Sequence, residues 1–208
     1  MQRTIGTVIF DYGGVLSLPP DNKKMLKMAE TSGLEPAIFE QEYRRHRSEY
    51  DRGTLTVSDY WSKVLWAGGV TAIDKLTETL ISLDIELWTA VNQAIVDWSA
   101  LLKDSGYRTA VLSNMARETL AYINKNFPWI RNFDTCTYSC ELGLIKPEPQ
   151  IYHTCLEALG VVAEETLFID DSSENTEAAE RLGLHTLTFQ SLDAAKETIE
   201  QKYGLPLS

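Results

Sequence analysis

Two short apolar runs of the chain, which lie about 160 residues apart, each end in aspartate. The run Thr7–Phe10 precedes Asp11, and residues 166–169 precede Asp170 and Asp171. Such runs are typical of buried parallel strands, and open α/β sheets bind ligands beyond the carboxyl ends of their strands. Neighbouring strands would bring three carboxylates together, and a hard divalent cation such as Mg²⁺ would relieve their repulsion. We therefore expect a magnesium site here.

The predicted elements that must position these acids alternate between strand and helix, except for one long helical stretch. We expect strands at residues 4–10, 108–112, 134–139, 166–169 and 185–189. Helices are expected between them at residues 86–104, 117–126, 150–159, 174–182 and 192–202. The first two strands are separated by helical patterning alone, at residues 22–31, 36–52, 57–67 and 72–83.

This order of elements predicts an α/β fold. Strands that alternate with helices form a Rossmann-like, doubly wound parallel sheet, and a stretch too long for a loop forms a small all-helical cap inserted after the first strand. We place the catalytic core at residues 1–17 and 85–208 and the helical cap domain at residues 18–84.

The composition is that of an acidic globular protein. The 208 residues are 44% hydrophobic, and 19 basic against 30 acidic residues give a net charge of −11. Nucleic acids and anionic membranes bind basic faces, so we expect neither as a partner. The sequence offers no secretory signal and no apolar run of roughly 20 residues, and its three cysteines cannot all pair with one another, so a cytoplasmic location is expected.

Four short motifs occur in the order and at the strand ends or turns of a known superfamily. They are residues 10–16 (FDYGGVL), 112–114 (LSN), 146–147 (KP) and 168–171 (FIDD). Together they resemble the haloacid dehalogenase-like hydrolases, in the branch with a helical cap after the first strand. The Asp-x-Gly of the first motif and the Arg52-Gly53 turn are similar to bacterial sugar phosphatases of the alpha-D-glucose-1-phosphate phosphatase type.

The resemblance implies a phosphoryl-transfer role for each motif. Asp11 is the expected nucleophile, which forms an aspartyl-phosphate that water hydrolyses, and Lys146 is expected to stabilise the developing charge. The phosphate-binding groups are expected from Gly13, Gly14, Ser113, Asn114 and Lys146.

The resemblance also implies the ligands of the metal. These are Asp11, the backbone carbonyl of Gly13, Asp170 and Asp171. Asp171 is the preferred direct ligand, with Asp170 close behind it, and Glu174 or Asn175 is expected to anchor metal-bound water.

One position departs from the family pattern. Most phosphatases of this superfamily carry a second aspartate, a general acid and base, where this chain has Gly13, and such a group is worth about 10²–10⁴ in rate. The Tyr12 side chain should point away, since alternate residues of a strand end face opposite sides. Either another group or water substitutes, or the leaving group needs little protonation, as in an anomeric sugar phosphate or an acyl phosphate.

We therefore expect a Mg²⁺-dependent phosphomonoesterase, monomeric or homodimeric, that acts on a small phosphorylated metabolite, with sugar phosphates among the candidates. One alternative is a metal-independent 2-haloacid dehalogenase, which uses the same nucleophile on carbon but lacks paired acids like Asp170 and Asp171. Another is a weakly active member that binds a phosphorylated ligand or has a regulatory function, which only the glycine at position 13 favours.

The cap carries a basic and aromatic stretch that could choose the substrate. Arg44, Arg47 and Arg52 cannot all share one helix face, so one or two at most should face the site. The solvated face is expected to pair with Glu40, Glu42 and Glu49. Trp61 and Trp66 are interpreted as core residues of the cap.

Overall fold

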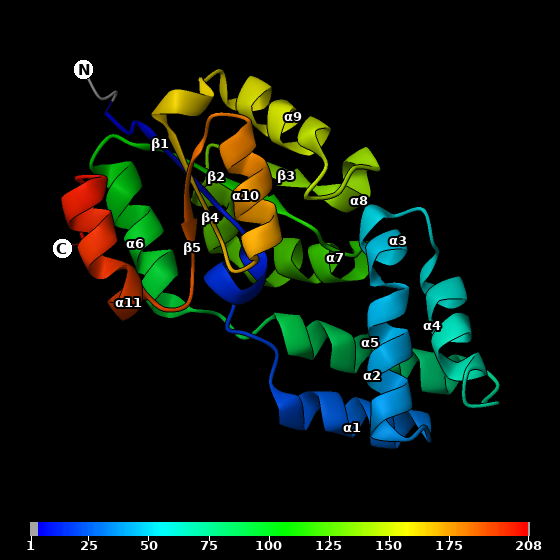
Figure 1. The fold of residues 1–208 in the computed structure, drawn as a ribbon. Coiled ribbons are helices and arrows are strands. Elements are labelled where there is room, and N and C mark those ends of the chain that lie inside the picture. The colour runs from blue at the N-terminus through cyan, green and yellow to red at the C-terminus, as the bar shows by residue number, and fades with distance from the viewer. Residues whose placement is uncertain (1–3, 208) are drawn as a thin grey trace.

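The computed structural model describes residues 4–207 and contains a five-stranded sheet with helices on both faces (Figure 1). All strand pairs are parallel, in the order β3-β2-β1-β4-β5. The strands are β1 (Thr7–Phe10), β2 (Arg108–Ser113), β3 (Thr135–Tyr138), β4 (Thr166–Asp170) and β5 (His185–Thr188). The predicted α/β fold is confirmed, and the five predicted strands are present with ends shifted by a few residues.

Alternating side chains of the central strands bury two separate apolar layers. Val8 and Phe10 of β1 pack with the helices of one face, and Ile9 packs with those of the other. The first face carries α6 (Gln93–Asp104), α7 (Arg117–Asn126), α11 (Leu192–Glu197) and the short helix Thr198–Lys202. The second face carries α9 (Pro149–Leu159) and α10 (Ser173–Arg181). Short helical turns lie at Pro128–Asn132, α8 (Ser139–Leu142) and Ala163–Glu165.

A second group of helices lies beside the sheet and has an apolar core of its own (Figure 1). Its helices are α1 (Asn22–Ser32), α2 (Pro36–Arg45), α3 (Arg47–Arg52), α4 (Val57–Trp66) and α5 (Asp74–Trp88). The Asp21 and Thr56 side chains accept backbone N–H groups at the starts of α1 and α4, and glycines with positive φ follow α1 and α3. Such caps satisfy backbone groups that have no partner within a helix. We refer to this group as the cap.

Two predicted helices differ from the structure. The helix expected over residues 36–52 is interrupted at His46, where φ is −102° and ψ is 1°, so α2 and α3 are separate. The helix expected from residue 86 begins instead at Gln93. Residues between α5 and α6 pair with the chain that leaves the core, through an antiparallel bridge between Ser17 and Val91. The expected boundary at residue 84 thus falls inside α5.

The two tryptophans assigned to the core of the cap have different environments. Trp61 is fully buried, as predicted, whereas Trp66 is 78% exposed at the end of α4, so that prediction was wrong. Helical spacing groups residues on one face but does not say how far that face continues under a neighbouring element. Within residues 4–207, no helix is long and apolar enough to cross a membrane.

Candidate active site

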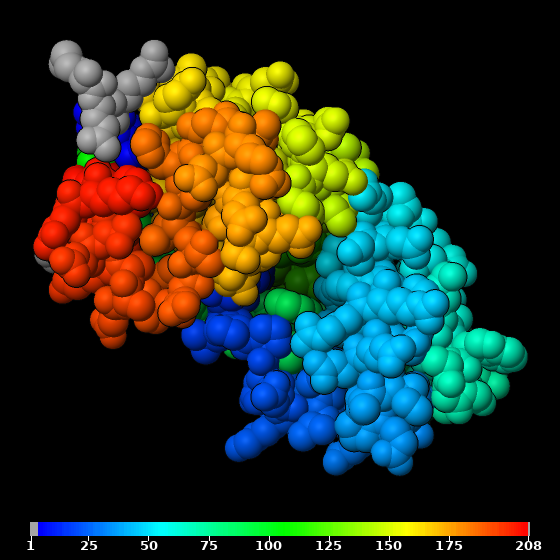
Figure 2. Space-filling view, in the orientation of Figure 1, coloured from blue at the N-terminus to red at the C-terminus, as the bar shows by residue number. Residues whose placement is uncertain are grey.

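The candidate site lies at the carboxyl ends of β1, β2 and β4. Asp11 directly follows β1, Ser113 ends β2 and Asp170 ends β4. Phe10 pairs with Ile169 in the parallel register, and the Asp11 N–H donates to the Ile169 carbonyl oxygen at 2.8 Å, so these strand ends lie side by side. A pocket of about 320 Å³ lies there between core and cap, and the space-filling view shows a hollow along the seam between them (Figure 2).

Three carboxylates and one lysine form the charged centre of the site. Oxygen atoms of Asp11, Asp170 and Asp171 lie within 4.8 Å of one another. The Lys146 Nζ atom lies 2.8 Å from Asp11 Oδ1 and 2.6 Å from Asp170 Oδ2, and the lysine side chain is 1% exposed. The structure therefore brings together the acids and the lysine that the sequence singled out. One cation faces three acids, so negative charge is in excess.

The excess negative charge shifts the pKa values of the cluster. Burial raises the pKa of Asp11 to about 7; Lys146 opposes this rise, while Asp170 and Asp171 add to it. Burial and the neighbouring Asp170 also raise the pKa of Asp171. Burial lowers the pKa of Lys146, but Asp11 and Asp170 outweigh this effect and raise that pKa, so the lysine stays charged. The donor set fits a hard divalent cation, which would supply the missing positive charge.

The two consecutive acids after β4 have different surroundings. Asp170 is fully buried, and its oxygens accept from Lys146 Nζ, from the Ser172 N–H at 2.8 Å and from Asn175 Nδ2 at 3.0 Å. Asp171 is exposed and lines the pocket. Asp170 is thus held by three donors, whereas the Asp171 carboxylate is open to a ligand.

The turn after β1 requires glycine at position 14. Gly14 has a φ of +69°, and a Cβ atom there would lie 2.3 Å from Asp171 Oδ2. The absence of a side chain therefore lets the Asp171 carboxylate approach the backbone of this turn. The Tyr12 N–H donates to Asp11 Oδ1 at 2.6 Å, which fixes the orientation of that carboxylate.

Gly13, the position that departs from the family pattern, lies against the cap. A Cβ atom at Gly13 would be 3.3 Å from Cζ3 of Trp88, the last residue of α5. The indole ring thus fills the space that a side chain at position 13 would need. The Tyr12 ring stacks on Trp129 with centroids 6.5 Å apart and packs into the core, although Tyr12 is also among the residues that line the pocket.

The two polar residues after β2 lie at the pocket, but Asn114 makes contacts that the sequence did not predict. Its Nδ2 donates to the Lys146 carbonyl oxygen at 3.0 Å, and its Oδ1 accepts from the Lys146 N–H at 2.8 Å. Asn114 thereby holds the backbone of Lys146, whose side chain contacts Asp11 and Asp170. Ser113, at 2% exposure, and Asn114 both line the pocket, where a phosphate group could reach them.

Sequence reasoning missed several pocket residues of the cap, of the loop between β2 and α7, and of α7. They are Tyr43, Asp51, Trp88, Met115 and Thr119. Tyr43 and Asp51 lie four residues before and after Arg47, and this spacing on one helical face was the available signal. The helix is interrupted at His46, between Tyr43 and Arg47, yet both Tyr43 and Asp51 contact Arg47. The residue spacing does not reveal this interruption. Nothing in the sequence joined them to the distant Trp88 or Thr119.

Arg47 is the centre of a buried polar network beside the pocket. Its Nη1 donates to Asp84 Oδ1 at 2.9 Å, and its Nε donates to Asp51 Oδ2 at 3.0 Å. The Tyr43 hydroxyl donates to Asp84 Oδ1 at 2.5 Å and accepts from Trp88 Nε1 at 2.9 Å. The network fixes the Trp88 ring over Gly13, and it leaves the Arg47 charge balanced by two carboxylates.

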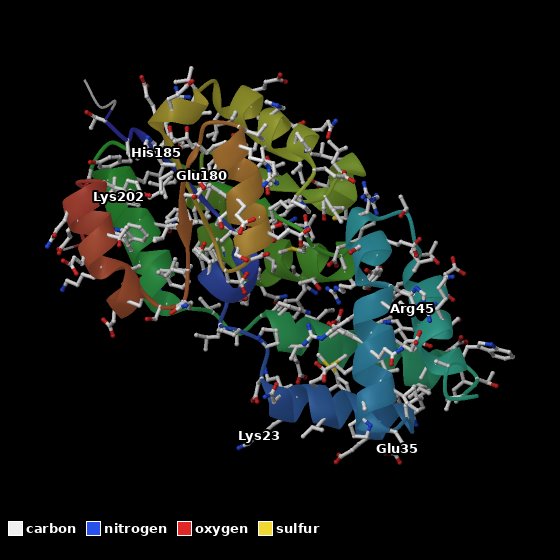
Figure 3. All side chains as sticks on the ribbon, viewed as in Figure 1. Lys23, Glu35, Arg45, Glu180, His185 and Lys202 are labelled. Carbon is white, nitrogen blue, oxygen red and sulfur yellow. The ribbon has the colours of Figure 1, made fainter. Side chains whose placement is uncertain are left out.

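The other cap arginines divide as the helix-face argument predicts. Arg44 lines the pocket and pairs with Glu40 at 2.9 Å. Arg45, labelled in Figure 3, lies on the surface of the cap and pairs with Glu42 at 3.4 Å. Arg52 does not line the pocket but forms an ion pair with Glu148 of the core, with Nη2 at 2.5 Å from Oε1. Arg44 and Arg47 are thus the two that reach the site.

The chain matches known proteins over most of its length. The family model described as haloacid dehalogenase-like hydrolase matches residues 5–183. The GMP/IMP nucleotidase YrfG of Escherichia coli (strain K12) is 28% identical over 189 residues, which are 88% of this chain and 81% of that protein. Mouse acyl-CoA dehydrogenase family member 10 is 28% identical over 173 residues, 81% of this chain. The chain spans only 14% to 39% of the first four curated relatives.

Solved structures with the same fold include a HAD family enzyme of Bacteroides thetaiotaomicron. It superposes with a TM-score of 0.74 at 24% identity, over 90% of this chain and 95% of that one. The L-2-haloacid dehalogenase of Xanthobacter autotrophicus has a TM-score of 0.67 at 19% identity, over 98% of this chain and 86% of that one. The fold is a parallel α/β sheet with a helical cap, and the site is a cluster of carboxylates at the strand ends. The chain belongs to the haloacid dehalogenase-like hydrolases.

Proposed function

We propose that the protein is a Mg²⁺-dependent phosphomonoesterase of small phosphorylated metabolites. The observation that carries this proposal is the cluster of Asp11, Asp170 and Asp171 around the single cation of Lys146. The E. coli relative named as a GMP/IMP nucleotidase supports phosphate-ester chemistry. The Bacteroides HAD enzyme has been solved with magnesium and inorganic phosphate, which supports the same metal and product class here.

The metal would be held by Asp11, Asp171 and the Gly13 carbonyl, with Asp170 and Asn175 behind them. When bound, Mg²⁺ supplies positive charge that offsets repulsion between the acids and an incoming phosphate. Asp170 already accepts from Lys146 and Asn175, so we assign it to positioning these donors.

Asp11 acts as the nucleophile in this proposal. The Tyr12 N–H and Lys146 Nζ both contact Oδ1, which leaves Oδ2 for attack on phosphorus. The new oxygen–phosphorus bond forms as the bond to the leaving oxygen breaks, and that oxygen takes up a proton from water, since Gly13 supplies no acid. Water then cleaves the aspartyl-phosphate and releases phosphate. Lys146 stabilises the charge, while Ser113 and backbone N–H groups of the Gly13–Gly14 turn bind phosphate oxygens.

The remaining features of the molecule are proposed in the same way. The segment through residue 17 and the segment after α5 form the catalytic core, and the cap runs from residue 18 to the end of α5 at Trp88 rather than to residue 84, in a cytoplasmic protein that is monomeric or homodimeric. A sugar phosphate is a good candidate substrate, because an anomeric phosphate leaves with little protonation and Gly13 supplies no acid.

The main alternative function is that of a metal-independent 2-haloacid dehalogenase. A curated (S)-2-haloacid dehalogenase 4A of Burkholderia cepacia is 33% identical, but over only 41% of this chain. A metal-free site has no use for the open carboxylate of Asp171, which would repel the haloacid carboxylate. This acid therefore favours the phosphatase.

The test is phosphate release from p-nitrophenyl phosphate, with Mg²⁺ and with EDTA, beside Asp11→Asn as the control. We expect release that requires Mg²⁺ and is lost in the variant, which should keep its fold by circular dichroism. Halide release from 2-haloacids without phosphate release would overturn the proposal.

A further inference from the structure

We propose that Asp51 and Thr119 bind hydroxyl groups of the substrate, so that the substrate is a phosphate ester of a small polyhydroxylated molecule, such as a sugar or a polyol. This inference rests on the proposed phosphatase function and names the class of its substrate. Three pocket-lining residues have a buried polar atom that lacks a hydrogen-bond partner among residues 4–207. One is Tyr12, whose ring stacks on Trp129, and the inference starts from the other two.

The first of these atoms is Asp51 Oδ1, which has the Arg47 charge as a neighbour but accepts no hydrogen bond. Asp51 is 8% exposed, and Arg47 Nε lies 2.9 Å from Oδ1 and 3.0 Å from Oδ2, but its hydrogen is directed at Oδ2. Burial raises the pKa of this carboxyl although Arg47 opposes the rise. The carboxylate is therefore poorly solvated, and a hydroxyl donor from the substrate would supply the hydrogen bond that Oδ1 lacks.

The second unpaired atom is Thr119 Oγ1 on α7. Thr119 is 2% exposed, and no donor or acceptor among residues 4–207 reaches its hydroxyl. Buried hydroxyls are normally hydrogen-bonded, so an unpaired one that lines a ligand pocket indicates a partner that arrives with the ligand. A threonine hydroxyl both donates and accepts, which matches the hydroxyl group of a sugar.

The two residues lie on opposite sides of the seam between cap and core. Asp51 belongs to α3 of the cap, and Thr119 belongs to α7 of the core. Their sequence neighbours join these helices directly, since the Tyr50 hydroxyl donates to Glu118 Oε2 at 2.8 Å. Both residues line the pocket that also contains Asp11, so a ligand phosphate at Asp11 can extend its remaining part toward them.

Charge and size argue against other ligand classes. Arg47 is balanced by Asp51 and Asp84, and Arg44, the other pocket arginine, pairs with Glu40, so each has a carboxylate partner that a second phosphate would have to displace. The volume of about 320 Å³ is at the lower end of ligand pockets, which favours a sugar or polyol over a nucleoside.

The test compares kcat/KM for a hexose phosphate with that for p-nitrophenyl phosphate, whose leaving group has no free hydroxyl. Thr119→Val, which keeps the shape, should lower this ratio about 2- to 10-fold, and Thr119→Ser should keep it. Asp51→Asn should lower it about 10-fold or more, since it weakens a charged acceptor. In the unmodified enzyme, deoxy analogues of the preferred hexose phosphate should lose a similar factor.

Three outcomes would overturn the inference. They are an unchanged ratio in folded Thr119→Val and Asp51→Asn, equal rates on hexose phosphates and their deoxy analogues, and a preference for phosphoethanolamine or GMP. These outcomes count against the inference only if the unmodified enzyme hydrolyses p-nitrophenyl phosphate. If the unmodified enzyme released phosphate from no substrate, the proposed phosphatase function would fail instead, so the two failures are distinguishable.

Discussion

Asp11 has two requirements that conflict within this site. A nucleophilic carboxylate must be ionised, yet this one is buried beside two further acids, and its pKa is raised to about 7. Lys146 provides one positive charge for the three acids. A bound divalent cation would favour the ionised form, so metal binding and activation of the nucleophile depend on the same charge imbalance.

This imbalance predicts how the stability of the metal-free protein depends on pH. The pKa of Asp11 is 3.8 without perturbation and about 7 in the folded protein. Between these values the folded state keeps a proton that the unfolded state has lost, so a rise in pH favours unfolding. In EDTA, the free energy of unfolding from urea titrations should fall between about pH 4 and pH 7, by at most about 1.4 kcal/mol per pH unit for this proton. It should then level off.

The control for this prediction is Asp11→Asn, which cannot ionise at this position. Its stability should change less with pH, with a residual slope from Asp171, whose pKa is also raised. At pH 8 in EDTA the variant should be more stable than the unmodified protein, and added Mg²⁺ should narrow the difference. The same pH slope in both proteins would show that other groups cause it.

At the scale of elements, the last residue of α5 determines what the turn after β1 can contain. Trp88 lies 3.3 Å from the position of a Cβ atom at Gly13, and Tyr43 holds its indole N–H. The missing aspartate and this tryptophan are therefore linked, because one space cannot hold both side chains without movement. A cap helix thus limits the catalytic groups of the core.

The link predicts non-additive effects of Gly13→Asp and Trp88→Leu. Gly13→Asp alone should destabilise the protein by about 1–3 kcal/mol, since an added side chain in a packed space forces its neighbours to move. In the Trp88→Leu background the same change should cost less and should raise the rate on alkyl phosphates, whose leaving oxygen needs a proton, relative to p-nitrophenyl phosphate. Thermal unfolding and the ratio of the two rates are the measurements. Additive changes in stability would show that Trp88 does not exclude a side chain at position 13.

The strands and the residues that follow them could be predicted from the sequence, because each depends on a few consecutive residues. Asp11 and Asp170 meet as expected, since parallel strands end at one edge of the sheet, and Lys146 reaches both from the turn between α8 and α9. The pairing of Asn114 with Lys146 and the contact of Trp88 with Gly13 were not predictable, because they depend on how distant segments pack. The helical pattern was also misleading at Trp66, where the spacing indicated a buried side chain but the structure leaves it 78% exposed.

At the scale of the whole molecule, cap and core meet through a small set of polar contacts. Arg52 binds Glu148 and also donates to the Gly143 carbonyl oxygen at 3.1 Å, and the Ser139 hydroxyl donates to the Asp51 carbonyl oxygen at 2.5 Å. At Gly53 a Cβ atom would lie 2.9 Å from the Cys140 carbonyl oxygen, so glycine permits this close approach. These contacts hold α3 against α8, and α3 carries Asp51 to the pocket.

We therefore expect the Arg52–Glu148 pair to contribute to substrate binding although neither residue lines the pocket. Arg52→Gln and Glu148→Gln should each raise KM about 2- to 5-fold, as a partly exposed ion pair is worth about 0.2–1 kcal/mol. The double variant should be no worse than either single variant, because both remove the same contact. Added salt should raise KM in the unmodified enzyme more than in the variants.

The matched control is Lys103→Gln, which breaks an ion pair with Asp134 at 2.9 Å that lies within the core. Both pairs are partly exposed, so loss of an ion pair as such should affect them alike, and only loss of cap closure should raise KM. Hydrogen exchange on α3 and α8 should accelerate in Arg52→Gln and stay unchanged in Lys103→Gln. Equal KM values for these two variants would contradict the prediction, and independent, additive effects of Arg52→Gln and Glu148→Gln would show that the pair does not act as one contact between cap and core.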